Sequence, residues 1–263
     1  MKINHVNIPI FLPELACPHR CIFCNQSQIS GKTSVPSIQE TIRIIENHLQ
    51  TIQAFSEVQV AFFGGSFTGL PIDMQEDYLR VVQPFIESGK ITGIRLSTRP
   101  DYISDPILVM LKQYGVEEIE LGAQSFYDEV LKSSGRGHTA ADIINASKKI
   151  LNHGIRLGLQ MMTGLPGDTN EMAFQTAKQI VAAGAHSTRI YPTLVIKDTP
   201  LEVLYKRGLY KPQTMSEAVG SAARLYRFFE ENNVTVLRVG LHSNEDFNNG
   251  ISLIDGPYHP SFK

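Results

Sequence analysis

Short apolar runs alternate with segments of helical hydrophobic periodicity along most of the chain. Residues 58–63 form a mainly apolar run typical of a buried strand, whereas Ile38, Ile42, Ile45 and Leu49 recur at helical spacing. The same contrast predicts strands at residues 4–11, 58–63, 93–98, 117–121, 155–162 and 187–191. It predicts helices at about residues 38–55, 74–87, 105–114, 127–131, 139–153 and 171–183.

This alternation predicts an α/β fold built from parallel βαβ units. Six strands are too few for an eight-stranded barrel, but sheets of this type carry their functional loops at the carboxyl ends of their strands. The polar, glycine-rich and cysteine motifs do follow the predicted strands, at Cys17, Gly64, Arg99, Gln124, Gly164 and Pro192. We therefore expect six loops to meet at one rim of the sheet.

The pattern changes beyond Tyr191. Residues 197–212 are rich in loop formers around a short predicted helix at 201–206, and a long helix is predicted at 216–232 with a strand at 234–240. Residues 242–263 show no clear element. We therefore expect a core at residues 1–195 and a C-terminal extension at 196–263 that packs on it, within one structural domain overall.

Composition limits the possible partners. The chain has 263 residues, of which 42% are hydrophobic, a net charge of -2 and a pI near 6.4, so it has no global attraction to nucleic acid or to an anionic membrane. It has no stretch approaching the roughly 20 apolar residues that cross a bilayer, and no signal-peptide pattern. These features predict a cytoplasmic protein without a membrane partner.

All three cysteines of the chain lie in one segment, at Cys17, Cys21 and Cys24. Thiolates are soft metal ligands, and three of them on one short loop can converge on a single centre. They can hold zinc, with His19 as a fourth ligand, or an iron–sulfur cluster that keeps one iron without a protein ligand. Incidental buried cysteines are the third interpretation, and the spacing alone leaves all three open.

Two further rim motifs can bind a ligand. Gly64, Gly65 and Ser66 can present backbone groups closely to an amino or carboxylate group, although most double glycines are simply tight turns. The amide of Gln124 can bind hydroxyls and the guanidinium of Arg136 can hold a carboxylate at two points. The ordinary alternatives are a satisfied strand-end amide and a solvated surface charge.

The remaining motifs have simpler explanations. Residues 164–168 are typical of a strand-to-helix turn in which Asp168 or Thr169 caps the following helix. His138, His186 and His242 are interpreted as ordinary polar residues rather than metal ligands.

Taken together, the motifs resemble the radical S-adenosylmethionine (SAM) superfamily, whose hallmark is C-x3-C-x-aromatic-C, here Cys17, Cys21, Phe23 and Cys24, followed by a glycine-rich strand end. The resemblance implies a partial (βα)6 TIM-like barrel. It implies a [4Fe-4S] cluster on the three cysteines, with its open iron chelated by SAM. It also implies an external electron donor such as flavodoxin or ferredoxin, and cleavage of SAM to a 5′-deoxyadenosyl radical.

A finer resemblance, over roughly residues 5–240, is to the radical domain of the Elongator catalytic subunit group. The segments that carry it are residues 97–102, 120–125, 136–139, 189–196 and 208–211. By position it implies that Gly64 and Gly65 contact the methionine part of SAM, and the adjoining Ser66 is expected to bind the cofactor as well. It likewise assigns the SAM carboxylate to Arg136, the ribose to Gln124 and Gln160, and the neighbourhood of adenine to Phe23.

The chain departs from that group in three ways. Ser97 stands where those relatives commonly have a ribose-binding glutamate, and neither the acetyltransferase domain nor the basic amino-terminal extension is found in the sequence. The substrate is therefore open: tRNA is one candidate, met by the basic segment Lys197, Lys206, Arg207 and Lys211. A small molecule, as in the coproporphyrinogen oxidases that share the Gln124 and Arg136 pattern, is another. A non-enzymatic, zinc-stabilised binding module is the third hypothesis.

Overall fold

The computed structural model describes residues 4–12, 21–30, 34–52, 56–241 and 245–262. Cys17, His19 and His242 lie outside these ranges. Among the helices of the described part of the chain, none combines the length and the apolar character that a membrane span requires.

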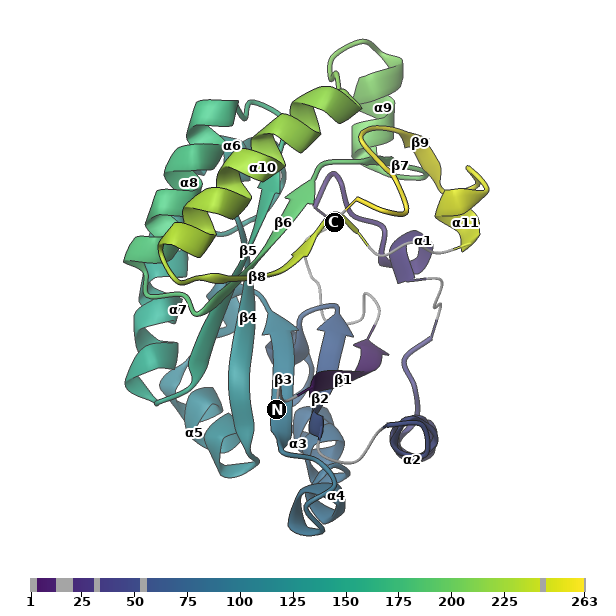
Figure 1. The fold of residues 1–263 in the computed structure, drawn as a ribbon, viewed down its shortest axis with the longest axis vertical. Helices are drawn as coiled ribbons and strands as arrows, with labels where there is room; N and C mark the ends of the chain where they lie inside the picture. The colour runs from purple at the N-terminus through teal and green to yellow at the C-terminus, as the bar shows by residue number, and fades with distance from the viewer. Residues whose placement is uncertain (1–3, 13–20, 31–33, 53–55, 242–244, 263) are drawn as a thin grey trace.

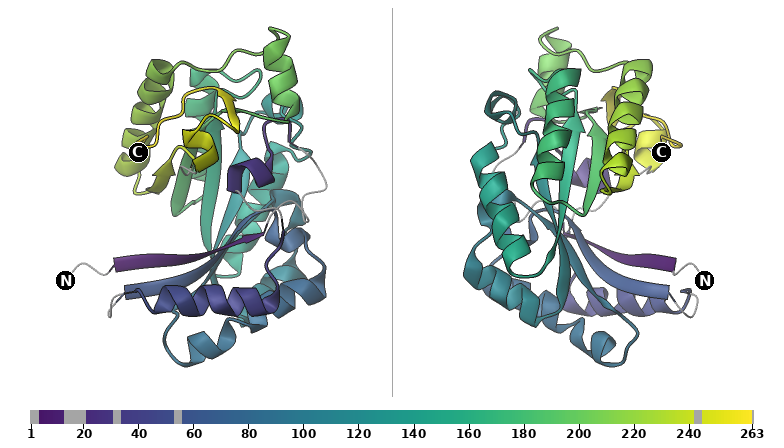
Figure 2. Two further views of the ribbon diagram at one scale, coloured as in Figure 1. Left: turned by 90° about the vertical axis from the view of Figure 1, so that its right-hand side faces the viewer. Right: turned by 60° about the vertical axis from the view of Figure 1, so that its left-hand side comes forward.

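Seven parallel strands form the main sheet, in the order β1-β2-β3-β4-β5-β6-β8. They are β1 (Asn4–Leu12), β2 (Ser56–Gly64), β3 (Gly93–Thr98), β4 (Val116–Gln124), β5 (Arg156–Thr163), β6 (Ser187–Pro192) and β8 (Thr235–Val239). The sheet curls into a half barrel with its carboxyl ends on one rim (Figure 1, Figure 2). The predicted α/β partial barrel is confirmed, as are its first six strands.

The seventh strand comes from the segment predicted as a C-terminal extension. β8 pairs in parallel with β6, so the sheet draws strands from both sides of residue 195. The expectation of no element in residues 242–263 is wrong, because β9 (Leu253–Asp255) pairs antiparallel with β7 (Val195–Ile196). A strand this short has no periodicity of its own to reveal it.

Helices cover the convex face of the sheet and its rim (Figure 2). They are α1 (Gln26–Ser30), α2 (Ile38–Leu49), α3 (Ile72–Arg80), α4 (Gln83–Glu87), α5 (Asp105–Gln113), α6 (Asp128–Ser133), α7 (Ala140–Asn152), α8 (Asn170–Ala182), α9 (Pro200–Lys206), α10 (Met215–Glu231) and α11 (Glu245–Asn248), with 3₁₀ turns η1 (Phe67–Gly69) and η2 (Pro100–Tyr102). Because Pro84 cannot donate a backbone hydrogen bond and its ring clashes with the preceding turn, the single helix expected at 74–87 divides into α3 and α4.

Side chains alternate between the two faces of each strand, so one set points to the helices and the other into the concave side. The outward set makes the core and is fully buried, as at Ile8, Phe62, Leu96, Leu121 and Leu159. Each such side chain contributes about 1.5–3 kcal/mol on leaving water. The inward set is largely polar, which leaves the concave side available for polar chemistry.

Candidate functional site

The described part of the cysteine loop is docked at the rim of the sheet. Cys21 is buried, and the amide of Cys24 donates to the Cys21 carbonyl at 3.0 Å, which turns the chain between them. The neighbouring Ile22 donates to the carbonyl of Ser134 at 3.1 Å and accepts from the amide of Leu201 at 2.8 Å. Both described cysteines are therefore held between the segment after α6 and the start of α9.

Arg136 reaches this loop from the connection between β4 and α7. Its Nη1 donates to the Sγ of Cys21 at 3.1 Å, and its Nη2 donates to the carbonyl of Gly122. The side chain is buried, and its Nε has no hydrogen-bond partner among the described residues. The interpretation of Arg136 as a solvated surface charge is therefore wrong, because the guanidinium lies inside the protein against a predicted metal ligand.

Gln124 ends β4 beside Arg136. Its backbone has a positive φ of 68°, and its buried Oε1 has no hydrogen-bond partner among the described residues. A Cβ built on Gly122 would lie 3.1 Å from Gln124 Nε2 and 3.2 Å from Arg136 Nη2, so only glycine leaves both side chains their positions. A buried acceptor without a partner marks a place where a hydroxyl donor of a ligand fits.

The glycine-rich end of β2 lies close to the end of β1. Gly64 has a φ of +105°, a conformation that favours glycine, and a Cβ there would lie 3.0 Å from the carbonyl oxygen of Leu12. Gly65 donates to that same oxygen at 2.7 Å. The hydroxyl of Ser66 is used inside the protein, since it contacts Thr98 Oγ1 at 2.8 Å and accepts from the amide of Arg99 at 3.0 Å. The cofactor role predicted for Ser66 stays a prediction, and it would have to use the backbone.

Phe23 packs into a small apolar cluster under α9 with Val130, Leu165 and Leu201. The ring is buried, so it holds the cysteine loop against the rim. Its predicted place near an adenine stays a prediction.

Gln160 of β5 makes its hydrogen bonds with other residues than Arg136 and Gln124. Its Nε2 donates to Glu120 Oε2 at 3.2 Å and lies 3.5 Å from Ser97 Oγ. Glu120 also accepts from Arg95 at 2.7 Å and from Arg189 at 2.6 Å. Gln160 thus belongs to a charged network on the concave face of the sheet.

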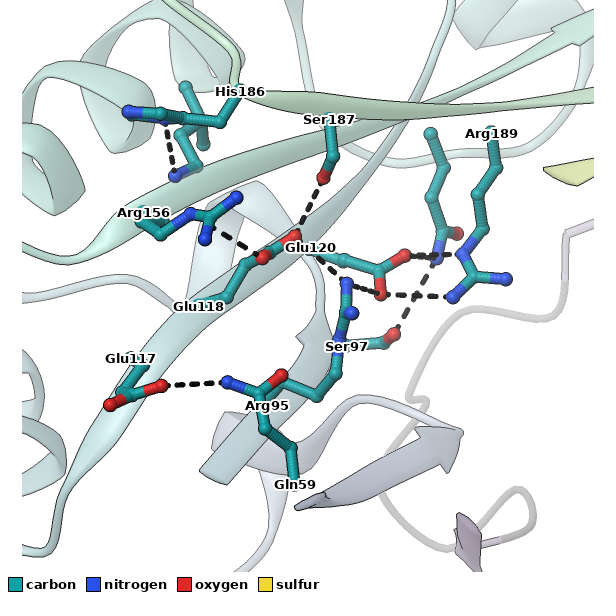
Figure 3. A network of polar contacts seen from close by, with 12 residues as sticks. Gln59, Arg95, Ser97, Glu117, Glu118, Glu120, Arg156, His186, Ser187 and Arg189 are labelled. Atoms are coloured by element: carbon teal, nitrogen blue, oxygen red, sulfur yellow. Dashed lines mark hydrogen bonds and ion pairs between the residues drawn. The ribbon is translucent and has the colours of Figure 1, made fainter. Parts of the chain in front are cut away.

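Sequence reasoning missed this network. Its charged members are Arg95, Glu118, Glu120 and Arg189 from β3, β4 and β6, together with the more exposed Arg156 of β5, whose Nε lies 3.8 Å from Glu118 Oε2 (Figure 3). Burial by itself would raise the pKa of Glu120, but the charges of Arg189 and Arg95 outweigh it and hold that pKa below its usual value. The sequence feature that could have predicted this network is the presence of charged residues at alternate positions within strands that are otherwise apolar.

Two other titratable groups lie near the rim. Burial, followed by the charges of Arg136 and Arg99, lowers the pKa of His138 to about 3, so this histidine is neutral at physiological pH. Burial raises the pKa of Asp168 to about 6, although its carboxylate accepts from the amide of Gly164 at 3.0 Å. The helix cap itself is Thr169, whose hydroxyl accepts from the amide at the start of α8. Of the two predicted caps, Asp168 and Thr169, it is therefore Thr169 that caps α8.

The residues present suit an anionic, polar cofactor held by thiolates. Cys21 and Cys24 offer sulfur ligands, Arg136 brings a buried cation, and Gln124 brings a buried acceptor for a hydroxyl. These are the groups that a [4Fe-4S] cluster and SAM require. Cys17, the third predicted ligand, lies outside the described residues.

Comparison with known proteins agrees with this arrangement. The family described as the Radical SAM superfamily matches residues 15–180, and the Radical_SAM C-terminal domain matches residues 185–263. The tRNA uridine(34) acetyltransferase of Methanocaldococcus infernus is 28% identical over 77% of this chain and 46% of its own length. Elongator complex protein 3 of Saccharomyces cerevisiae is 28% identical over 69% of this chain and 36% of its own length. The chain thus spans about half or less of the length of these two relatives.

Solved structures share the fold. The archaeal Elp3 of Methanocaldococcus infernus, with an N-terminal deletion, superposes with a TM-score of 0.72 at 21% identity, covering 95% of this chain and 64% of that one. The coproporphyrinogen III oxidase of Escherichia coli superposes with a TM-score of 0.57 at 17% identity, covering 88% and 52%. With the family match extending over more than half of its residues, this chain belongs to the Radical SAM superfamily and is an enzyme of that class.

Proposed function

We propose that this enzyme cleaves SAM reductively at a [4Fe-4S] cluster held by Cys17, Cys21 and Cys24, and that it acts on tRNA in the manner of the Elongator group. The observation that carries the cofactor part is Arg136, a buried cation that touches Cys21 and keeps its Nε without a partner in the described part of the chain. A buried guanidinium of this kind calls for anionic ligands.

Each nearby group has a role that follows from its chemistry. The Nε of Arg136 is suited to the carboxylate of SAM, and the unpartnered Oε1 of Gln124 is suited to a ribose hydroxyl. The backbone at Gly64 and Gly65, which carries no Cβ, allows the methionine part to approach closely. When bound, the cluster and SAM supply one-electron cleavage of the sulfonium to a 5′-deoxyadenosyl radical, with the electron delivered by an external flavodoxin or ferredoxin.

Support for tRNA comes from the relatives and from the position of the basic segment. Two groups of relatives are named as tRNA uridine(34) acetyltransferases and as Elongator complex protein 3. Lys197, Lys206, Arg207 and Lys211 are all exposed. The segment that carries them begins against the cysteine loop, since Leu201 donates to the carbonyl of Ile22 at 2.8 Å. Exposed cations beside the radical site suit a phosphate backbone.

The cofactor part is tested by anaerobic reconstitution followed by dithionite and SAM. We expect about four irons per chain, in keeping with the cubane, and release of 5′-deoxyadenosine. A colourless protein that binds one zinc ion, or a loaded protein that forms no 5′-deoxyadenosine, contradicts the proposal.

The tRNA part is tested separately, by comparing modified nucleosides in tRNA from cells with and without the gene. We expect one uridine modification to disappear. The variant with Lys197, Arg207 and Lys211 all changed to Ala should bind tRNA more weakly, with a salt slope lower by about 2–3, while it retains its iron. An unchanged nucleoside profile together with an unchanged salt slope contradicts the proposed action on tRNA. That result does not affect the proposed cofactor chemistry.

A further inference from the structure

Arg136 is a buried cation, and within the described residues no carboxylate compensates its charge. Only 6% of the residue is exposed, and no ion pair in the described part of the chain joins it to Asp or Glu. A guanidinium keeps its proton at any physiological pH, so a buried one needs a counter-charge or strong acceptors. In the part of the chain that the structure describes, its acceptors are the carbonyl of Gly122 and the Sγ of Cys21, at 3.1 Å from Nη1. The sulfur is the one that can carry a negative charge.

The ion pair between Arg99 and Asp101 holds the backbone of Arg136 in place. The Nη2 of Arg99 donates to the backbone carbonyl of Arg136 at 2.5 Å. Asp101 grips Arg99 at two points, accepting from Nε at 2.9 Å and from Nη2 at 2.9 Å. Arg99 is almost completely buried, whereas the side chain of Asp101 is 25% exposed, so this pair is only partly shielded from water and salt. The order of contacts is therefore Asp101, Arg99, Arg136 and then Cys21.

We propose that Arg136 sets the reduction potential of the cluster by donating a charge-assisted hydrogen bond to the thiolate of Cys21, with Arg99 and Asp101 as positioning residues. The inference rests on the proposed cluster. Reduction adds one electron from the external donor to the oxidised cluster, and the added negative charge is shared by the iron and its sulfur ligands. A cationic donor on one sulfur stabilises the reduced form more than the oxidised form, and so raises the potential.

The same chain contains a contrasting contact on the next ligand. Cys24 receives the neutral amide of Gln26, at 3.4 Å between Nε2 and Sγ. This bond is longer and carries no formal charge, so it favours the reduced form less than the Arg136 contact does. Of these two contacts within the described residues, the one from Arg136 should therefore change the potential more when it is removed.

The test is a potentiometric titration of the reconstituted protein, followed by electron paramagnetic resonance of the reduced cluster. SAM is left out, so that loss of a SAM contact cannot change the result. Arg136→Gln should shift the potential to a more negative value, lowering the equilibrium constant for reduction roughly tenfold. Arg136→Lys keeps the charge and should recover part of that shift. Lys132→Gln removes an exposed cation on the same connection and should leave the potential unchanged.

Asp101→Asn tests the positioning role without touching the cysteine loop. It weakens the two hydrogen bonds that Arg99 donates to residue 101. We therefore expect the reduction potential to shift in the same direction as in Arg136→Gln, but by less. If Arg136→Gln takes up too little iron for a titration, Asp101→Asn provides the test instead. An unshifted potential in Asp101→Asn then refutes the proposal. Equal potentials in wild type and a fully loaded Arg136→Gln refute it directly. A wild-type chain that binds no cluster refutes the proposed function instead, and this inference with it.

Discussion

Arg189 and Glu120 form a two-point ion pair across the concave face of the half barrel. Arg189 Nε lies 2.6 Å from Glu120 Oε2, and its Nη2 lies 3.2 Å from Oε1 (Figure 3). The two residues stand on β6 and β4, so the pair reaches across β5. Glu120 is 1% exposed and binds Arg95 as well, so its carboxylate is shared by a buried cation, Arg95, and a largely buried one, Arg189.

Glu120→Gln should therefore be strongly destabilising. Arg95 keeps its ion pair with Glu118 at 2.8 Å, but Arg189 loses the carboxylate it binds, and breaking a buried ion pair on one side costs about 3–5 kcal/mol. Urea unfolding at neutral pH measures this as a lower free energy of unfolding. Asp77→Asn is the control, because its pair with Arg80 is solvent-exposed and should contribute less than about 1 kcal/mol. Equal stability of Glu120→Gln and wild type would show that the network is not stabilised by this charge.

Gly158 is the residue of β5 over which that network passes. A Cβ at this position would lie 2.8 Å from Ser187 Oγ and 2.9 Å from Glu120 Cγ. Gly158→Ala should force both side chains to move and lower the free energy of unfolding by about 1–3 kcal/mol. Gly220→Ala in α10 is the matched control: its Cβ meets nothing within 4 Å, so it should stabilise by up to about 1 kcal/mol. The opposite order of stabilities would mean that the strands shift easily at Gly158.

Asp168 makes stability depend on pH in a defined direction. Its pKa rises from 3.8 to about 6 on folding, because burial disfavours the charged carboxylate. A folded pKa above the unfolded one stabilises the protein at low pH, and that contribution is lost as the pH rises from about 4 through 6. Asp168→Asn, which keeps an acceptor for Gly164, should exceed wild type by about 1–2 kcal/mol at pH 8. Urea unfolding should show that difference shrinking towards pH 4, and a difference independent of pH speaks against the burial of this charge.

Gln124→Ala tests the proposed ribose contact. The change removes the unpartnered buried Oε1, so SAM binding to the reconstituted protein should weaken by about 1 kcal/mol, or roughly fivefold, in calorimetry. Iron content should stay the same, because Gln124 is not a predicted ligand. Gln113→Ala removes an exposed amide from the end of α5 and serves as the control. Undiminished SAM affinity in Gln124→Ala assigns its amide a structural role only.

The order of the strands and the position of the rim could be predicted from the sequence, because apolar runs at residues 58–63 or 93–98 and helical periodicity between them are local signals. The cysteine spacing and the glycine-rich strand end are local as well, and they indicated a metal-binding rim before any contact was known. The strand predicted at residues 234–240 is β8, whereas β9 was missed: its partner is β7, far along the chain, and pairing at that distance leaves no periodic pattern in a short strand.

What the amino-acid sequence determined by itself was which chemistry is present: three thiols, a glycine-rich turn, and Gln124 and Arg136 after one strand. The tertiary structure decided which of these groups meet. Arg136 and Cys21 are 115 residues apart along the chain and yet form a hydrogen bond, while Gln160 joins Glu120 on the concave face instead. The reason is physical. The curl of the sheet brings together the ends of strands that are far apart along the chain, and a buried charge is stabilised only by partners on the strands beside it.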